Sequence, residues 1–431
     1  MVKINRIARC FTQRNVRFKM ITKQRRKQLL DAMDDFSLFI EFGGNEIRRS
    51  ADANYPFSIK RNFYYLTNID EQEAVLILIK LPHRQSETLF IRDIDLTLQK
   101  WNGTYLTSTK ASEQSEIASI SSLSSLEGYI QSHLTRSGIR KIYVDIERLA
   151  KTDRVSVDEA WTVLMKQSYP TLSFENMNAR INSMRTRKDK SEVDAIINAI
   201  DITKNAFERM LDSTKTAKCE YELQAEFEYV LKKHNATPAF DMIVASGKDA
   251  TILHYVKNNK KIEDDSLVLC DMGASKDYYN SDISRTFPKS GQFTDVQKKY
   301  YNLVLEAMDR VFDKIRPGVT LKQLNDEVID LYQARLKEFG LIKESHEVSR
   351  YYYHGVSHFL GLDVHDVGQV EQMVLAPGQI ITVEPGIYIE ELGFGIRIED
   401  DVLVTEDGYE NLSAGIIKRI EDIENRMKGN G

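Results

Sequence analysis

The 431-residue chain has few cysteines and no long apolar run, and both shortages narrow the classes of protein to which it can belong. Its three cysteines, Cys10, Cys219 and Cys270, are odd in number and far apart, so they give no disulfide framework. No stretch approaches the roughly 18 apolar residues that a membrane-spanning helix needs. Hydrophobic residues make up 42% of the chain and charged residues 29%, as in an ordinary globular protein. We therefore expect a cytoplasmic protein without a membrane partner.

Acidic residues are missing from the first 28 positions, where ten basic residues lie. Because the formal net charge is −5, the rest of the chain carries about −15. A secretory signal would need an apolar stretch, which this segment lacks. An Arg-rich, acid-poor start fits a mitochondrial presequence, a weak nucleic-acid contact, or an extension in front of a true start at Met20. We favour the extension, predict that residues 1–20 are disordered, and expect no nucleic-acid partner.

Strand-like and helix-like runs alternate in the first part of the chain. The strand-like runs are 37–42, 74–80, 87–92 and 141–145. Apolar residues recur every three or four positions over 115–134, which predicts an amphipathic helix there. Alternating strands and helices predict an α/β domain over residues 21–180.

A second domain is predicted over residues 181–431. Asp189 and Glu192 have the spacing of a capping box, which indicates the start of a long helix. The long helices predicted in this domain span about 190–214, 219–234, 294–315 and 321–339.

Five side chains that bind metal ions well each follow a strand-like run in this second domain. They are Asp271, Asp282, His358, Glu384 and Glu399. Four carboxylates and one imidazole form an oxygen-rich set that suits two divalent cations sharing bridging carboxylates. Taken singly, the aspartates could be turn residues, and Glu399 could form a structural ion pair. The set as a whole predicts a metal centre.

Histidine is scarce, yet three of the eight histidines lie within twelve residues, at positions 354, 358 and 365. Imidazole is a common nitrogen ligand for metals and a proton carrier near neutral pH. His254 is a fourth candidate, although a lone histidine in an apolar setting is more often a core residue. The cluster indicates a reactive site in the same part of the chain.

Together these segments resemble the metallopeptidases of the pita-bread fold, and in particular the aminopeptidase P (Xaa-Pro aminopeptidase) family. The segments that carry the resemblance are LVLCDMGA, YYNSDISRTF, HGVSHFLGLDVHD, ITVEPGIYI and GIRIEDDVLV, with RSADANYP and NFYYLT upstream. The resemblance implies an α/β two-domain protein. A creatinase-like α/β domain would precede a pita-bread α+β catalytic domain, whose curved antiparallel sheet is covered by helices.

The resemblance also implies a ligand set for two divalent metal ions, with Mn²⁺ as the expected metal. In the family pattern Asp282 and Glu399 bridge the two ions. Asp271 binds one ion, and His358 and Glu384 bind the other. Glu384 would also act as a catalytic acid and base.

Further residues match positions that line the substrate site of the family. His254, His354 and His365 would bind substrate and steady the transition state, and Tyr388 would lie close to the substrate. Arg397 matches an arginine beside the bridging glutamate, and we count it as catalytic. Because related enzymes form dimers or tetramers, a homo-dimer or homo-tetramer is expected.

The hypothesis that follows is hydrolysis of the N-terminal Xaa-Pro bond, with peptides carrying proline at position two as substrates. A water bridging two dications would have a lowered pKa, and Glu384 could take its proton and pass it to the departing nitrogen. The proline preference comes from the resemblance alone.

Three alternatives stay open at this point. Xaa-Pro dipeptidase uses the same metal set, although Ser357 and the RSADANYP segment favour the aminopeptidase. Creatinase-like hydrolysis would not need the dimetal ligand set. A metal-free peptide-binding or protein-binding module is disfavoured, because such modules have lost ligands and all five are present here.

Overall fold

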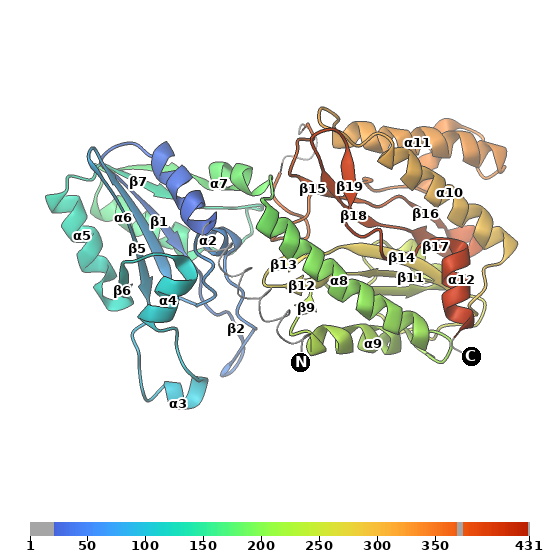
Figure 1. Cartoon of the computed structure of the whole chain (residues 1–431), viewed down its shortest axis with the longest axis horizontal. Helices are drawn as coiled ribbons and strands as arrows, with labels where there is room; N and C mark the ends of the chain where they lie inside the picture. The colour runs from blue at the N-terminus through green and yellow to red at the C-terminus, as the bar shows by residue number, and fades with distance from the viewer. Residues whose placement is uncertain (1–20, 369–373, 430–431) are drawn as a thin grey trace, which may run out of the picture. The chain divides into compact units, whose positions relative to one another are not determined.

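The computed structural model describes residues 21–368 and 374–429, so the predicted basic extension lies outside the described residues. The chain divides into two compact units, one ending at Arg185 and the other beginning at Thr186 (Figure 1). The sequence places the boundary a few residues earlier, at 180. Each unit is described by itself below.

The first unit is built on a six-stranded mixed sheet of order β6-β5-β4-β1-β7-β8. Its strands are β1 (Ser37–Phe42), β4 (Val75–Leu81), β5 (Arg84–Ile91), β6 (Ile120–Ser122), β7 (Lys141–Val144) and β8 (Ser173–Asn176). The short hairpin β2 (Arg48–Ser50) and β3 (Ala53–Asn54) pairs separately. A helix over residues 21–32 opens the unit. The helices that follow it are α2 (Arg61–Thr67), α3 (Gln99–Asn102), α4 (Ser108–Ser115), α5 (Leu126–Arg136), α6 (Val157–Ser168) and α7 (Asn178–Arg185).

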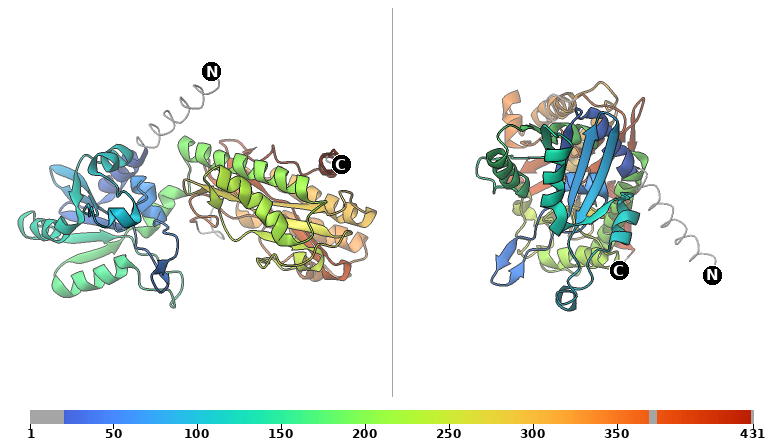
Figure 2. Two further views of the ribbon diagram at one scale, coloured as in Figure 1. Left: turned by 90° about the horizontal axis from the view of Figure 1, so that it is seen from below. Right: turned by 90° about the vertical axis from the view of Figure 1, so that its left-hand side faces the viewer.

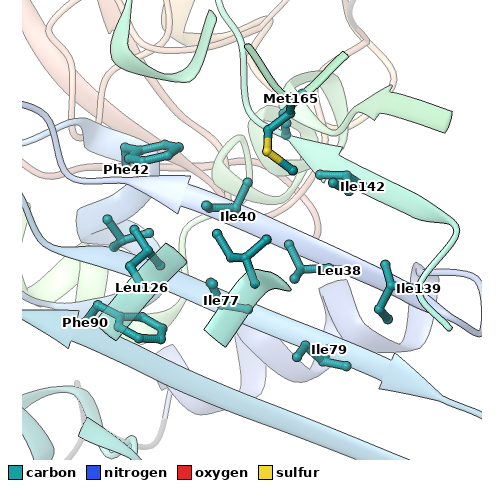
Figure 3. Packing of buried hydrophobic residues seen from close by; sticks show 13 residues of the cluster. Leu38, Ile40, Phe42, Ile77, Ile79, Phe90, Leu126, Ile139, Ile142 and Met165 are labelled. Carbon is teal, nitrogen blue, oxygen red and sulfur yellow. The ribbon is translucent and has the colours of Figure 1, made fainter. Parts of the chain in front are cut away.

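The core of the first unit lies on the central strands. Leu38 and Ile40 of β1 and Ile77 of β4 are fully buried, and Leu126 of α5 and Met165 of α6 pack with them (Figure 3). β1 is buried at all six positions, as expected of a central strand covered on both faces.

One helix prediction in this unit is wrong in its first half. Residues 120–122 form strand β6, which pairs in parallel with Leu89–Ile91, and α5 begins only at Leu126. Apolar residues three apart fit a short strand and a turn as well as a helix, so sheet pairing decided the outcome.

The second unit contains four long helices at the predicted places. They are α8 (Lys190–Ser213), α9 (Glu220–Lys233), α10 (Asp295–Phe312) and α11 (Leu321–Glu338). The capping box of Asp189 and Glu192 is present at the start of α8. α8 packs on α9, and α10 packs on α11 (Figures 1 and 2). A shorter helix, α12 (Ile420–Lys428), contacts α8.

The strands of the second unit pair antiparallel throughout the described residues. They are β9 (Thr237–Pro238), β10 (Ile243–Ser246), β11 (Leu267–Met272), β12 (Ala274–Lys276), β13 (Tyr279–Asn280), β14 (Ile283–Pro288), β15 (Ile380–Val383), β16 (Gly386–Ile389), β17 (Phe394–Arg397), β18 (Asp400–Val404) and β19 (Tyr409–Asn411). Short 3-10 turns are η2 (Gly247–Thr251), η3 (Ser345–Arg350) and η4 (Glu390–Leu392). Among the residues that the structure describes, no helix is both long and apolar enough to cross a bilayer.

Candidate active site

Strands β11 and β14 carry the two aspartates of the predicted centre. Asp271 lies near the end of β11 opposite Ser284 of β14, and Asp282 directly precedes β14. The chain between them turns through β12 and β13. Gly273 permits this turn, because a Cβ there would lie 1.9 Å from the Ser281 carbonyl oxygen. The hairpin therefore brings together two carboxylates that are eleven positions apart.

The histidine segment runs antiparallel beside β15, which delivers Glu384. Thr382 donates its N–H to the His358 carbonyl, Leu360 donates to Ile380, and Glu384 donates to Val356. The Thr382 hydroxyl accepts the His358 N–H at 3.1 Å. Two segments that are separate in sequence thus present an imidazole and a carboxylate next to each other.

The predicted ligands converge in one place. Donor atoms of Asp282, His358 and Glu399 all lie within 4.8 Å of one another. His358 Nε2 is 3.4 Å from a carboxylate oxygen of Asp282 and 3.5 Å from one of Glu384. Asp271 lies outside the triplet but is close enough for its charge to raise the pKa values of Asp282, Glu384 and Glu399.

Burial and mutual repulsion strongly shift the pKa values of the predicted metal ligands. Burial, together with the charge of Asp271, raises the pKa of Asp282 to about 7. Burial also raises the pKa of Glu384, and that of Glu399 rises well above its usual value. Burial alone would lower the pKa of His358, but the Asp282 and Glu384 carboxylates raise it to about 9. Crowded buried carboxylates of this kind are relieved by a cation.

The residues present fit a divalent metal ion. The donor set is hard and oxygen-rich with one imidazole. In addition, Asp271 Oδ1 is buried and has no hydrogen-bond partner among the described residues. His358 Nδ1 lies 3.1 Å from the Phe359 carbonyl oxygen, which can only accept, so Nδ1 carries the hydrogen. Nε2 is therefore the nitrogen that faces the carboxylates and that could bind a metal ion once it has lost its proton, the orientation expected of a metal-binding histidine.

Arg397 donates hydrogen bonds to one carboxylate and two hydroxyls of the site. Its guanidinium donates to Asp271 at 2.7 Å, to the Ser284 hydroxyl at 2.8 Å and to the Tyr388 hydroxyl at 3.0 Å. The Ser284 hydroxyl in turn donates to Glu399 at 2.8 Å. Sequence reasoning missed Ser284, although it lies two positions after Asp282, and the period-two alternation of a strand places both on one face.

His354 and Tyr388 form a hydrogen-bonded pair at this site. His354 Nδ1 lies 2.7 Å from the Gly355 carbonyl oxygen, and Nε2 lies 2.8 Å from the Tyr388 hydroxyl. Burial, with the nearby charge of Arg397, lowers the pKa of His354 to about 4. His354 is therefore neutral at pH 7, with Nδ1 donating and Nε2 accepting from Tyr388.

The other two predicted histidines lie at the exposed side of the site. The ring of His365 is 4.5 Å from that of His358, centroid to centroid. Burial lowers the pKa of His365, and the charges of His358 and His254 lower it further. The charge of His254 also lowers the pKa of His354. His254 lies on an exposed turn that follows η2. All four histidines thus gather around the carboxylates.

Sequence reasoning also missed the support beneath Glu399. Arg285 is fully buried, forms an ion pair with Asp400 at 2.7 Å and donates to the Glu399 carbonyl oxygen. Asp401 accepts the backbone N–H of Asp282 at 3.1 Å. Only the folded chain brings these groups together, because each pair is more than 100 residues apart.

A buried cluster of carboxylates and an imidazole on antiparallel strands has the donor set of a divalent-metal centre. The model of metallopeptidase family M24 matches residues 194–406, and the model of the aminopeptidase P N-terminal domain matches residues 22–143. The chain belongs to the aminopeptidase P family of M24 metallopeptidases. It is therefore an enzyme that uses divalent metal ions, with the two-domain fold of that family.

Individual relatives cover nearly the whole chain. The Xaa-Pro aminopeptidase of Escherichia coli (strain K12) is 34% identical over 94% of this chain and 97% of its own length. That of Haemophilus influenzae is 35% identical over 94% and 96%. A solved Bacillus anthracis structure has a TM-score of 0.94 at 41% identity and covers 96% of this chain and 99% of its own. Zn-substituted Escherichia coli aminopeptidase P has a TM-score of 0.87 at 33% identity, over 96% and 99%.

Proposed function

We propose that this enzyme removes the first residue from peptides whose second residue is proline. The observation that carries the proposal is the convergence of the Asp282, His358 and Glu399 donor atoms within 4.8 Å. The Xaa-Pro aminopeptidase relatives support the same reaction, and they disfavour the dipeptidase alternative. Proline at position two forms a tertiary amide without an N–H, so a dedicated enzyme is chemically reasonable.

The proposed metal ligands are the five residues named from the sequence. Asp282 and Glu399 would bridge two ions, Asp271 would bind one, and His358 and Glu384 would bind the other. Bound divalent ions supply Lewis-acid stabilisation of the carbonyl oxygen and lower the pKa of an attacking water. We propose Mn²⁺ as the metal.

Glu384 is the proposed general base and acid. Its carboxylate is buried, and burial raises its pKa, which favours holding a proton between two transfer steps. It would accept a proton from the attacking water and return it to the departing proline nitrogen. The Thr382 hydroxyl lies 3.4 Å from Glu384 Oε1 and helps to fix the carboxylate.

The exposed His254 and His365 are the proposed hydrogen-bond donors to the scissile carbonyl oxygen. His354 is less suited to that role here, because both of its ring nitrogens already have partners. We propose that His354 and Tyr388 instead shape the substrate site. Arg397, hydrogen-bonded to Tyr388 and Asp271, would hold that side of the site in place.

An activity assay with added Mn²⁺ tests the proposal. We expect cleavage of an Xaa-Pro-Xaa tripeptide, abolished by a chelator, and much weaker cleavage of an Xaa-Ala-Xaa tripeptide. Cleavage confined to Xaa-Pro dipeptides would establish the dipeptidase instead.

Measuring bound metal together with activity shows whether a variant has lost its metal site. Asp282→Asn and Glu399→Gln should lose bound metal and activity, measured by elemental analysis and turnover. Asp277→Asn is the matched control, because the Asp277 side chain is 67% exposed in the turn before β13. It should keep both.

Cellular location and assembly belong to the same proposal. We propose a cytoplasmic homo-dimer or homo-tetramer, with a mitochondrial location as the alternative if residues 1–19 act as a presequence. Light scattering of the purified chain and fractionation of cells test these two points.

A further inference from the structure

A buried carboxylate that takes no part in the proposed chemistry lies at the start of α9. Glu220 is the first residue of that helix and is fully buried. Its Oε1 accepts from the Ser246 N–H at 2.8 Å and from the Ser246 hydroxyl at 2.7 Å. Its Oε2 accepts from the Tyr255 hydroxyl and the Lys260 N–H, both at 2.9 Å. Each oxygen therefore accepts two hydrogen bonds.

All four donors come from residues 246–260, which run from the last residue of β10 into the connection to β11. This stretch carries His254, directly before Tyr255. A buried charge is stable only where its hydrogen bonds are made. Because Glu220 depends on both ends of the stretch, its carboxylate fixes the path of the loop between them.

Tyr255 connects this carboxylate to the proposed active site. Its ring is buried in a cluster with Ala250, Leu269 and Tyr388. Tyr388 is the residue whose hydroxyl contacts His354 and Arg397. Burial and the hydrogen bond to Glu220 raise the pKa of Tyr255, so its hydroxyl stays a donor. Tyr255 thus shares an apolar cluster with a residue of the site, and its hydroxyl donates to Glu220.

Tyr353 and strand β17 contact the backbone just before His254. The Tyr353 hydroxyl donates to the Thr251 carbonyl oxygen. β17 also approaches η2 closely, since a Cβ on Gly395 would lie 2.1 Å from the Ala250 carbonyl oxygen. His254 itself is exposed on its turn. Its placement therefore comes from its neighbours rather than from burial of its own ring.

We propose that Glu220 is a positioning residue that, through Tyr255, holds His254 in place for the substrate. This inference rests on the proposed function, because it assumes that His254 contacts the peptide. A purely structural role for Glu220, as a stabiliser of the start of α9, is the competing explanation. The two differ in whether the effect of Glu220 passes through His254.

The test uses Glu220→Gln and Tyr255→Phe in the metal-loaded full-length enzyme. Each variant removes one or more of the hydrogen bonds of the Glu220 carboxylate and keeps nearly the same side-chain shape. We expect kcat/KM on an Xaa-Pro-Xaa tripeptide to fall roughly tenfold to a hundredfold, the range expected when a contacting group is misplaced by about 1 Å. The fall should be mainly in kcat, since His254 is proposed to act on the transition state. Tyr255→Phe carries the test alone if Glu220→Gln does not fold.

Controls come from the exposed face of the same helix. Glu226→Gln removes a partly exposed ion pair with Arg209, and Tyr229→Phe changes a half-exposed ring. Both should stay within about twofold of the wild type, as surface substitutions do. Amide hydrogen exchange over residues 247–260, measured without metal, gives a readout independent of turnover. Exchange should rise there in Glu220→Gln and Tyr255→Phe and stay unchanged in the controls.

A double-mutant cycle with His254→Ala decides between the two explanations. If Tyr255 acts through His254, adding Tyr255→Phe to His254→Ala should cost less than about twofold more, because coupled effects do not add. Fully additive losses, or wild-type kinetics in Tyr255→Phe while His254→Ala is impaired, would overturn the inference alone. Full activity of His254→Ala would overturn the proposed role of His254 and this inference with it. Absence of Xaa-Pro cleavage by the wild type would refute the proposed function itself.

Discussion

Replacing the buried Arg285 should destabilise the catalytic unit more than any exposed charge replacement. Arg285 pairs with Asp400, and both side chains are 0% exposed. Its guanidinium also donates to the carbonyl oxygens of Ser284, Glu399, Ile416 and Ile417. Arg285→Met removes every one of these bonds and leaves the Asp400 carboxylate to Asn411 and Lys418.

The expected size of the effect follows from this geometry. Arg285→Met removes five hydrogen bonds at about 1 kcal/mol each. Asp400 keeps Lys418 as a charge partner, so the total stays within the range of about 3–5 kcal/mol for broken buried ion pairs. We expect Arg285→Met to lower the free energy of unfolding of this unit by about that amount. Arg285→Lys keeps the charge but has too few donors for five acceptors. Two lost hydrogen bonds at about 1 kcal/mol each predict a loss of about 2 kcal/mol.

Urea unfolding followed by two probes measures this effect. Both tryptophans, Trp101 and Trp161, belong to the first unit, so their fluorescence reports on that unit. Far-UV circular dichroism follows both units, and the second transition is fitted separately because a two-domain chain need not unfold in one step. Metal is removed beforehand, so that lost metal binding does not add to the result.

An exposed arginine provides the control for the Arg285 variants. Arg419 lies 3.4 Å from Asp309 with both side chains about half exposed, and Arg419→Met should cost less than about 1 kcal/mol. A loss below about 1 kcal/mol for Arg285→Met, or equal losses for the two arginines, would refute the reasoning.

Three further predictions follow from the described contacts. Adding Mn²⁺ at about 100 times its dissociation constant should stabilise the catalytic unit by about 2.7 kcal/mol, and thermal unfolding of Glu399→Gln should not respond. Tyr388→Phe removes the hydroxyl between Arg397 and His354 and should lower kcat/KM about tenfold at unchanged metal content, so a wild-type value would contradict the proposed site. Burial, and the charge of Asp145, raise the pKa of Glu41 well above its usual value. Its contribution to stability is therefore present below the unfolded pKa and lost as pH rises through the folded pKa. Glu41→Gln should accordingly raise the midpoint of the tryptophan transition at pH 8 and change it less at pH 4, whereas a lower midpoint at pH 8 would reject this account.

Elements that depend on local sequence were predictable. The capping pair at Asp189 and Glu192 and the apolar periodicity after it were enough to predict α8, and α10 and α11 begin with capping boxes of their own. The five proposed ligands could be named because their residue types and segments match the ligand pattern of the family that the sequence resembles. The structure then brings Asp282, His358 and Glu399 together, as the metal-centre prediction requires.

What could not be predicted depends on pairing between distant segments. Strand β6 forms because residues 89–91 offer a parallel edge, and nothing within 115–134 reveals that edge. Arg285 and Glu220 were missed for a related reason. A buried charge can be recognised only when its partners are known, and those partners lie up to 132 residues away in the chain. Ser284 was within reach, since strand alternation alone aligns it with Asp282.

Two imidazoles of the histidine segment each donate from Nδ1 to the carbonyl of the very next residue, His354 to Gly355 and His358 to Phe359. The acceptor for the Nδ1 hydrogen of both rings thus lies within the same few consecutive peptide units. A designer who transplanted this short stretch with its backbone intact would carry both proton positions along. If only the two side chains were grafted onto another scaffold, either ring nitrogen could carry the hydrogen.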